Sequence, residues 1–125
     1  MTSGKRTAKK RSAAPAPNVF TDLVDRLRPL FAAMPTREVP MFGGLSFMAD
    51  DRMVVAAGKD GSLLVRVDPA RHDELTARPG AAVAEMGTGR SMGPGWLRVQ
   101  PEAIADETGL RFWFEAAMDF HDRLR

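Results

Sequence analysis

The chain has 125 residues, of which 44% are hydrophobic and 27% charged, an ordinary composition for one soluble domain with a modest core. It has no cysteine, which excludes disulfides, thiol catalysis and cysteine-ligated zinc. No apolar run approaches the ~20 residues that span a bilayer, and no apolar stretch follows the basic N-terminus as in a secretory signal. We therefore expect a cytoplasmic protein without a membrane partner.

The net charge of +2 is unevenly distributed along the chain. All 16 acidic side chains lie after residue 12, whereas the first twelve residues contain Lys5, Arg6, Lys9, Lys10 and Arg11. Residues 1–17 have no large apolar side chain after Met1 and cannot bury enough surface to offset the entropy of ordering. We expect a disordered basic arm that ends in an Ala-Pro linker, followed by one domain at residues 18–125.

The domain begins with a helical pattern, "NVFTDLVDRLRPLFAAMP". Pro29 lacks the N–H that would bond to the Asp25 carbonyl, so we expect a kink there, and Pro35 ends the helix. The apolar positions recur at helical spacing: Phe20, Leu23, Val24, Leu27, Phe31 and Met34.

From Val39 the pattern changes to three strand-like runs, "MFGGLSFMAD", "RMVVAAG" and "SLLVRVD". The turns between them are short, and one contains the pair Asp60-Gly61, so the runs predict an antiparallel meander. A short helix follows, with Asp68 as its N-cap, Pro69 at its first position and Pro79-Gly80 at its end.

Two further strands, "AAVAEM" and "GWLRVQ", are joined by the glycine-rich "GTGRSMGP". The last helix follows Asp106 as a cap and has one apolar face: Leu110, Trp113, Phe114, Ala117 and Leu124. The order is α-β-β-β-α-β-β-α. It predicts a two-layer α+β fold in which helices pack on one face of a five-stranded antiparallel sheet.

Two glycine motifs have the wrong context for nucleotide binding. A phosphate-binding loop needs a Lys-Ser or Lys-Thr and a helix after its glycines, but after Gly43-Gly44 a strand continues. We expect a β-bulge or a close contact between the strand and a helix there. In "GTGRSMG" the third glycine comes one residue too late for a dinucleotide fingerprint, and a strand follows it. This segment is typical of a flexible hairpin loop. Arg90 lies at its tip and is a candidate contact residue.

No catalytic constellation is visible in the sequence. His72 and His121 have no metal-ligand spacing, and we expect both to be solvated or partly packed. The carboxylate pairs lie in a turn and on a polar helix face, and the serines have no partner histidine. We expect no enzyme activity, no metal and no cofactor. The eight methionines indicate either adaptable core packing or an association surface.

Two segments resemble the N-terminal domain of the TfoX/Sxy family over about residues 19–124. "MFGGLSFMADDRMVVAAGKDGSLLVRVD" is similar to its opening block, a Met-Phe-Gly-Gly strand, a short turn, a strand beginning near a Met and a third strand ending in Val-Asp. "MGPGWLRVQPEAIADETGLRFWFEAA" is similar to its closing block, with the run Gly-Trp-x-Arg-Val-x-Pro-Glu before the last helix.

The resemblance implies a two-layer α+β domain with a five-stranded antiparallel sheet. The family is named for regulators of natural competence, which act in transcription control and carry a second, C-terminal helical domain. The chain ends at Arg125 with no room for that domain, so we expect a stand-alone N-terminal domain. No catalytic residues are established for the family, and the resemblance implies none here.

Two functional hypotheses follow. The first is a non-enzymatic regulatory module that binds an unknown protein partner and forms a homodimer, because strands such as "MVVAA" offer apolar side chains on both faces. The second is a small protein that binds nucleic acid nonspecifically through its arm; the alternative for the arm is a tail that only aids solubility. The candidate nucleic-acid contacts are Lys5, Arg6, Lys9, Lys10, Arg11 and Arg90.

Overall fold

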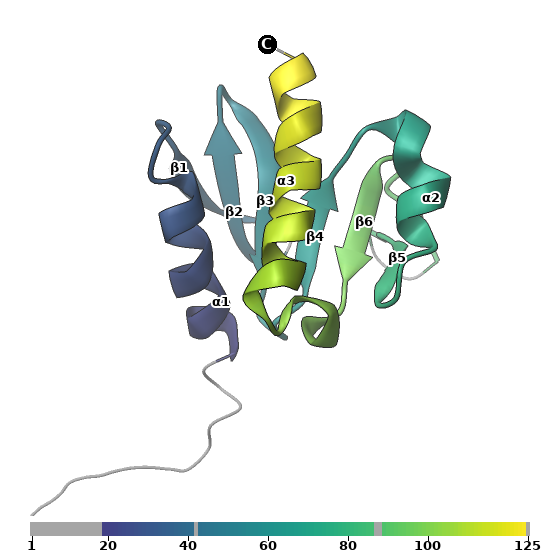
Figure 1. Ribbon diagram of the computed structural model, residues 1–125, viewed down its shortest axis with the longest axis horizontal. Helices are drawn as coiled ribbons and strands as arrows, with labels where there is room; N and C mark the ends of the chain where they lie inside the picture. Colours follow the sequence, from purple (N-terminus) through teal and green to yellow (C-terminus); the bar gives the residue numbers. More distant parts are fainter. Residues whose placement is uncertain (1–18, 42, 87–88, 125) are drawn as a thin grey trace, which may run out of the picture.

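The computed structural model describes residues 19–41, 43–86 and 89–124. These residues form one antiparallel sheet of six strands in the order β1-β2-β3-β4-β6-β5, with helices on one of its faces (Figure 1). The expected basic arm at residues 1–17 lies outside the described residues. The strands are β1 Arg37–Met41, β2 Gly44–Ala49, β3 Arg52–Gly58, β4 Leu63–Arg66, β5 Ala81–Val83 and β6 Trp96–Val99.

Two of the helical elements begin at the cap residues that the sequence predicts. Asp68 caps the 3₁₀ turn η3 by accepting from the N–H of Ala70 at 2.9 Å, and Asp106 caps α3 by accepting from the N–H of Gly109 at 2.7 Å. At Pro29 the first helix changes from α to 3₁₀ geometry. The helical elements are α1 Val19–Leu27, η2 Arg28–Phe31, η3 Pro69–Arg71, α2 His72–Thr76, η4 Pro101–Ile104 and α3 Glu107–Arg123.

The sheet has six strands, so the expectation of five strands in the order α-β-β-β-α-β-β-α was wrong. The additional strand is β1, which pairs only with β2 and forms one edge of the sheet. It contains Arg37, Glu38 and Pro40, residues that are unusual in a central strand but tolerated at an edge. Arg28 of η2 donates two hydrogen bonds of 2.9 Å to the Glu38 carboxylate, which ties this strand to the helix.

The paired glycines have two different structural roles in the turn from β1 to β2. Gly43 has a φ of +72°, in the left-handed region that favours glycine. Gly44 faces Gly58 across the β2–β3 pair, and a Cβ placed on it would lie 1.9 Å from the carbonyl oxygen of Ala57. The expectation of a strand-to-helix contact was wrong, because the close contact at Gly44 is between the two strands β2 and β3.

The core lies between the sheet and the helices α1, η2 and α3. Phe31 of η2 stacks on Phe47 of β2 with ring centroids 5.0 Å apart, and Phe114 of α3 meets Phe31 edge to face at 5.0 Å. In β3 all five residues from Met53 to Ala57 are buried. β3 lies between β2 and β4 and is the most completely buried of the six strands.

The face of the sheet opposite the helices is made of small side chains near its centre. Ser46, Ala56, Leu64 and Arg98 lie side by side in register across β2, β3, β4 and β6. Ser46 and Ala56 are buried within the single chain, so this part of the face does not need a second subunit to cover it. The Ser46 hydroxyl has no hydrogen-bond partner among the described residues.

Substituting the two glycines separately tests their roles. We expect Gly44→Ala to lower the free energy of unfolding by about 3 kcal/mol, because its methyl group would force β2 away from β3. Gly43→Ala meets no atom within 4 Å and carries only the strain of its positive φ, about 1 kcal/mol. Urea denaturation measures both. Equal losses in the two variants would contradict this assignment.

Candidate functional site

A cavity of about 340 Å³ lies on the face of the sheet opposite the helices. Its floor is formed by neighbouring residues of three strands, Ala56, Leu64 and Arg98, which face one another in register. Its volume is within the range of small-molecule sites. The cavity is lined by Ala56, Ala57, Gly58, Ser62, Leu64, Ala84, Glu85, Met86, Met92 and Arg98.

The hairpin that follows β5 forms one wall of this cavity. The N–H of Met92 donates to the Ala84 carbonyl at 2.9 Å, and the N–H of Met86 donates to the Arg90 carbonyl at 2.8 Å. Met86 is 54% exposed and is one of three exposed large hydrophobic side chains among the residues that the structure describes. The wall therefore presents two flexible, polarizable side chains to the cavity.

Arg98 and Ser62 line the other end of the cavity, and Asp60 behind them is bonded to both. Arg98 donates from Nε to the Ser62 hydroxyl at 3.2 Å and from Nη2 to Oδ2 of Asp60. The Ser62 hydroxyl donates to Oδ1 of Asp60 at 2.6 Å, and the Ser62 N–H donates to the same oxygen at 3.0 Å. These bonds hold the guanidinium of Arg98 in one orientation at the rim.

The charge state of Asp60 follows from its partners. Partial burial alone would raise the pKa of this carboxyl. The hydrogen bonds from Ser62 and the positive charge of Arg98 outweigh that effect and lower the pKa of Asp60 below its usual value. Asp60 therefore stays ionised at neutral pH and keeps Arg98 paired.

The contact residues predicted from the sequence are only partly described. Arg90 is exposed and lies at the end of the predicted hairpin, beside the bridge between Glu85 and Ser91. The predicted nucleic-acid contacts of the arm lie outside the described residues: Lys5, Arg6, Lys9, Lys10 and Arg11. Sequence reasoning missed Arg98. Its signal was a charged residue between the apolar residues of the strand "WLRV". Only the fold brings this residue close to Asp60 and Ser62.

The two histidines have structural partners. Nδ1 of His72 accepts from the N–H of Gly95 at 3.0 Å. His121 is 3% exposed, with Nε2 3.0 Å from Oδ2 of Asp50, so the expectation that it is solvated or partly packed was wrong. Asp50 and Asp51 both have positive φ, 52° and 62°, in the β2–β3 turn that brings Asp50 to α3.

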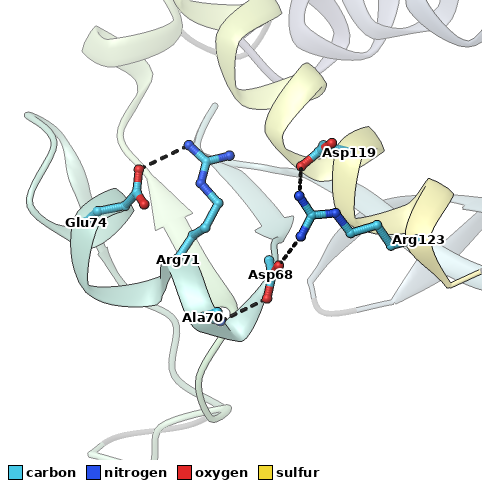
Figure 2. A network of polar contacts seen from close by, with 6 residues as sticks. All are labelled: Asp68, Ala70, Arg71, Glu74, Asp119 and Arg123. Atoms are coloured by element: carbon cyan, nitrogen blue, oxygen red, sulfur yellow. Dashed lines mark hydrogen bonds and ion pairs between the residues drawn. The ribbon is translucent and has the colours of Figure 1, made fainter.

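Figure 2 shows a second polar network, which joins the last turn of α3 to the start of η3. Arg123 donates from Nη1 to Oδ2 of Asp68 at 2.5 Å, and its Nη2 lies 3.2 Å from Oδ2 of Asp119. The other oxygen of Asp68 accepts from the N–H of Ala70. The Asp68 carboxylate thus caps a helical turn and holds the end of α3 in place, so this cluster has a structural role.

The lowered pKa of Asp60 predicts how its contribution to stability varies with pH. We expect Asp60→Asn to be less stable than the wild type at pH 7, and the difference to narrow below about pH 4. A carboxyl whose folded pKa is lowered contributes stability that is present above its unfolded pKa and lost as the pH falls through the folded pKa. Urea denaturation at several pH values measures the difference.

The control for this experiment is Asp73→Asn, which removes one negative charge from an exposed position on α2. A destabilisation of Asp60→Asn that grows on acidification would contradict the assignment.

Residues 19–41, 43–86 and 89–124 contain no cluster of three or more His, Asp or Glu side chains that could hold a metal ion. Within the same ranges no helix has the length and apolar character needed to cross a membrane.

Comparison with curated proteins and with solved structures gave no match. The sequence model of the TfoX N-terminal domain matches residues 28–121, from η2 to the last turns of α3. This range contains all six strands, both ends of the cavity and the two segments whose motifs resemble the family. The family is one of regulatory domains rather than of enzymes. The chain belongs to the TfoX N-terminal domain family.

Proposed function

We propose that this domain is a non-enzymatic, competence-regulator-like module that acts through protein contacts and forms a homodimer through the free edge of β5. The observation that carries this proposal is a difference between the two edges of the sheet. The β1 edge strand contains charged residues and a proline, whereas the short β5 edge strand contains neither. An unprotected edge strand is a template for pairing with another chain.

The outer edge of β1 is unsuited to accept a further strand. Pro40 has no N–H to donate, and Arg37 and Glu38 bring charges to the strand. The side chain of Glu38 is also held by Arg28, so the edge is covered by an ion pair. These are the devices that proteins use against edge-to-edge association.

Backbone hydrogen bonds fix the direction in which the groups of β5 point. The N–H of Gln100 donates to the Gly80 carbonyl at 2.8 Å, and the N–H of Ala84 donates to the Trp96 carbonyl at 2.9 Å. Gly80 and Ala84 therefore face β6, and so does Ala82 between them, because strand residues alternate.

The intervening residues of β5 point their backbone groups to the free edge. The N–H of Ala81 is taken by the Arg78 carbonyl at 3.1 Å, which leaves Val83 as the outward donor. Val83 is 39% exposed, and β5 contains only alanine and valine, without charge or proline. Two copies of this edge can pair antiparallel about a two-fold axis.

Substitution of Val83 tests the dimer. We expect the wild type to sediment as a dimer at tens of micromolar, and Val83→Pro to sediment as a monomer, because proline removes the outward donor and keeps the bonds to β6. The matched control is Val83→Ala, which keeps the N–H and should stay dimeric. A monomeric wild type, or a dimer in all three proteins with equal circular dichroism, would overturn the proposal.

A second candidate function is nonspecific nucleic-acid binding by the arm. The observation that favours it is the concentration of five cations within seven residues at positions 5–11, in a chain whose remaining residues are richer in acidic than in basic side chains. Such an arm would neutralise phosphates without reading bases.

Salt dependence tests this candidate. If all five side chains contact phosphates, log K for duplex DNA should fall with log salt at a slope of about −4.5. Replacement of the five cations by glutamine in the full chain should abolish binding, whereas Arg90→Gln should leave the slope nearly unchanged. If the variant without the five cations binds DNA as tightly as the wild type does, the arm is not the DNA-binding site, and Arg90 becomes the candidate contact.

A further inference from the structure

The cavity on the helix-free face has an apolar end and a polar end that contains Arg98. Its apolar part consists of Ala56, Leu64, Met86 and Met92, and Arg98 with its partners forms the polar part. A concave apolar site with a few fixed polar groups is the usual form of a small-molecule pocket. A ligand that fills the cavity therefore needs an apolar body and a polar head group.

The guanidinium of Arg98 has unused hydrogen-bonding capacity. Its Nε and Nη2 donate to Ser62 and Asp60, whereas Nη1 has no partner among the described residues. The side chain is 47% exposed, so a ligand can reach it. Because two bonds already fix its orientation, a ligand would not have to order this side chain on binding.

Planar carboxylates match the geometry of a fixed guanidinium better than other anions of similar size do. The other ionised group of the lining, Glu85, lies on the hairpin three residues beyond Ala82, which faces Arg98. At the strand rise of ~3.3 Å per residue, the backbone of Glu85 lies ~10 Å along the hairpin from that of Ala82. Arg98 is the basic residue of this lining, and its ion pair with Asp60 leaves Nη1 for a ligand carboxylate.

We propose that the cavity binds a small carboxylic acid with an apolar body, whose carboxylate bonds to Arg98 and whose body lies between Leu64 and the methionines of the hairpin. Met86 and Met92 can change rotamer to fit aliphatic or aromatic bodies. The proposal is independent of the dimer at the β5 edge, since it concerns the face of the sheet and needs one chain.

Methyl spectra of the full chain labelled at the methionine methyl groups test the proposal, with hexanoate and 4-phenylbutyrate as probes. We expect saturable shifts confined to Met86 and Met92 at millimolar ligand or below. Hexanamide and hexanol carry the same apolar body without the charge and should bind about tenfold more weakly or worse.

Variants locate the carboxylate. Arg98→Met should weaken hexanoate binding about tenfold or more, and Arg98→Lys should restore part of it, since lysine keeps the charge but not the planar fork. The matched control Arg111→Met, at an exposed position of α3, should bind as the wild type does. The thermal melt of each variant shows whether it is folded.

Three results would overturn the proposal. The first is the absence of saturable shifts at millimolar acid. The second is a set of equal shifts at all methionines, which indicates nonspecific association. The third is equal affinity for hexanoate and hexanol, which would show that Arg98 does not recognise the ligand.

Discussion

Burial of β3 is the constraint on which the rest of the structure depends. Helices α1 and α3 cover one of its faces, β2 and β4 flank it, and Met53 to Ala57 are all buried. The close approach of β2 is permitted only by glycine at position 44, because the Ala57 carbonyl occupies the space of a side chain. The stack of Phe31, Phe47 and Phe114 closes the helix side over this strand.

The same packing creates the cavity on the other face. With the helices on one side of the sheet, the opposite side presents Ala56, which is too small to fill the space beside Leu64 and the hairpin. Arg98 then comes from β6 and is fixed by the turn that precedes β4. The position of the core on the helix side therefore leaves a pocket on the other side that contains the oriented guanidinium of Arg98.

Local signals predicted the parts of the fold that depend on local chemistry. Asp68 and Asp106 cap helices as their sequence contexts indicate, and Pro29 changes the helix type where its N–H is missing. The strand β1 was missed because its pairing with β2 comes from the hairpin at Gly43, whereas Pro40 argues against a strand when the neighbours are unknown.

The candidate site was only partly accessible from the sequence for a related reason. The hairpin with Arg90 follows from its glycines, which are a local signal. The contact of Arg98 with Asp60 joins residues 38 positions apart, and that of His121 with Asp50 joins residues 71 apart. Neither pair has a spacing that periodicity can reveal, so only the register of the sheet and the position of α3 bring them together.

Hydrogen exchange of two neighbouring amides tests most directly whether the β5 edge meets another copy of the chain. The N–H of Ala82 faces β6, whereas that of Val83 faces the free edge. A dimer through this edge should slow exchange at Val83 as the protein concentration is raised through the dimer range, while exchange at Ala82 should change little. Exchange at Val83 that is fast and independent of concentration would contradict it.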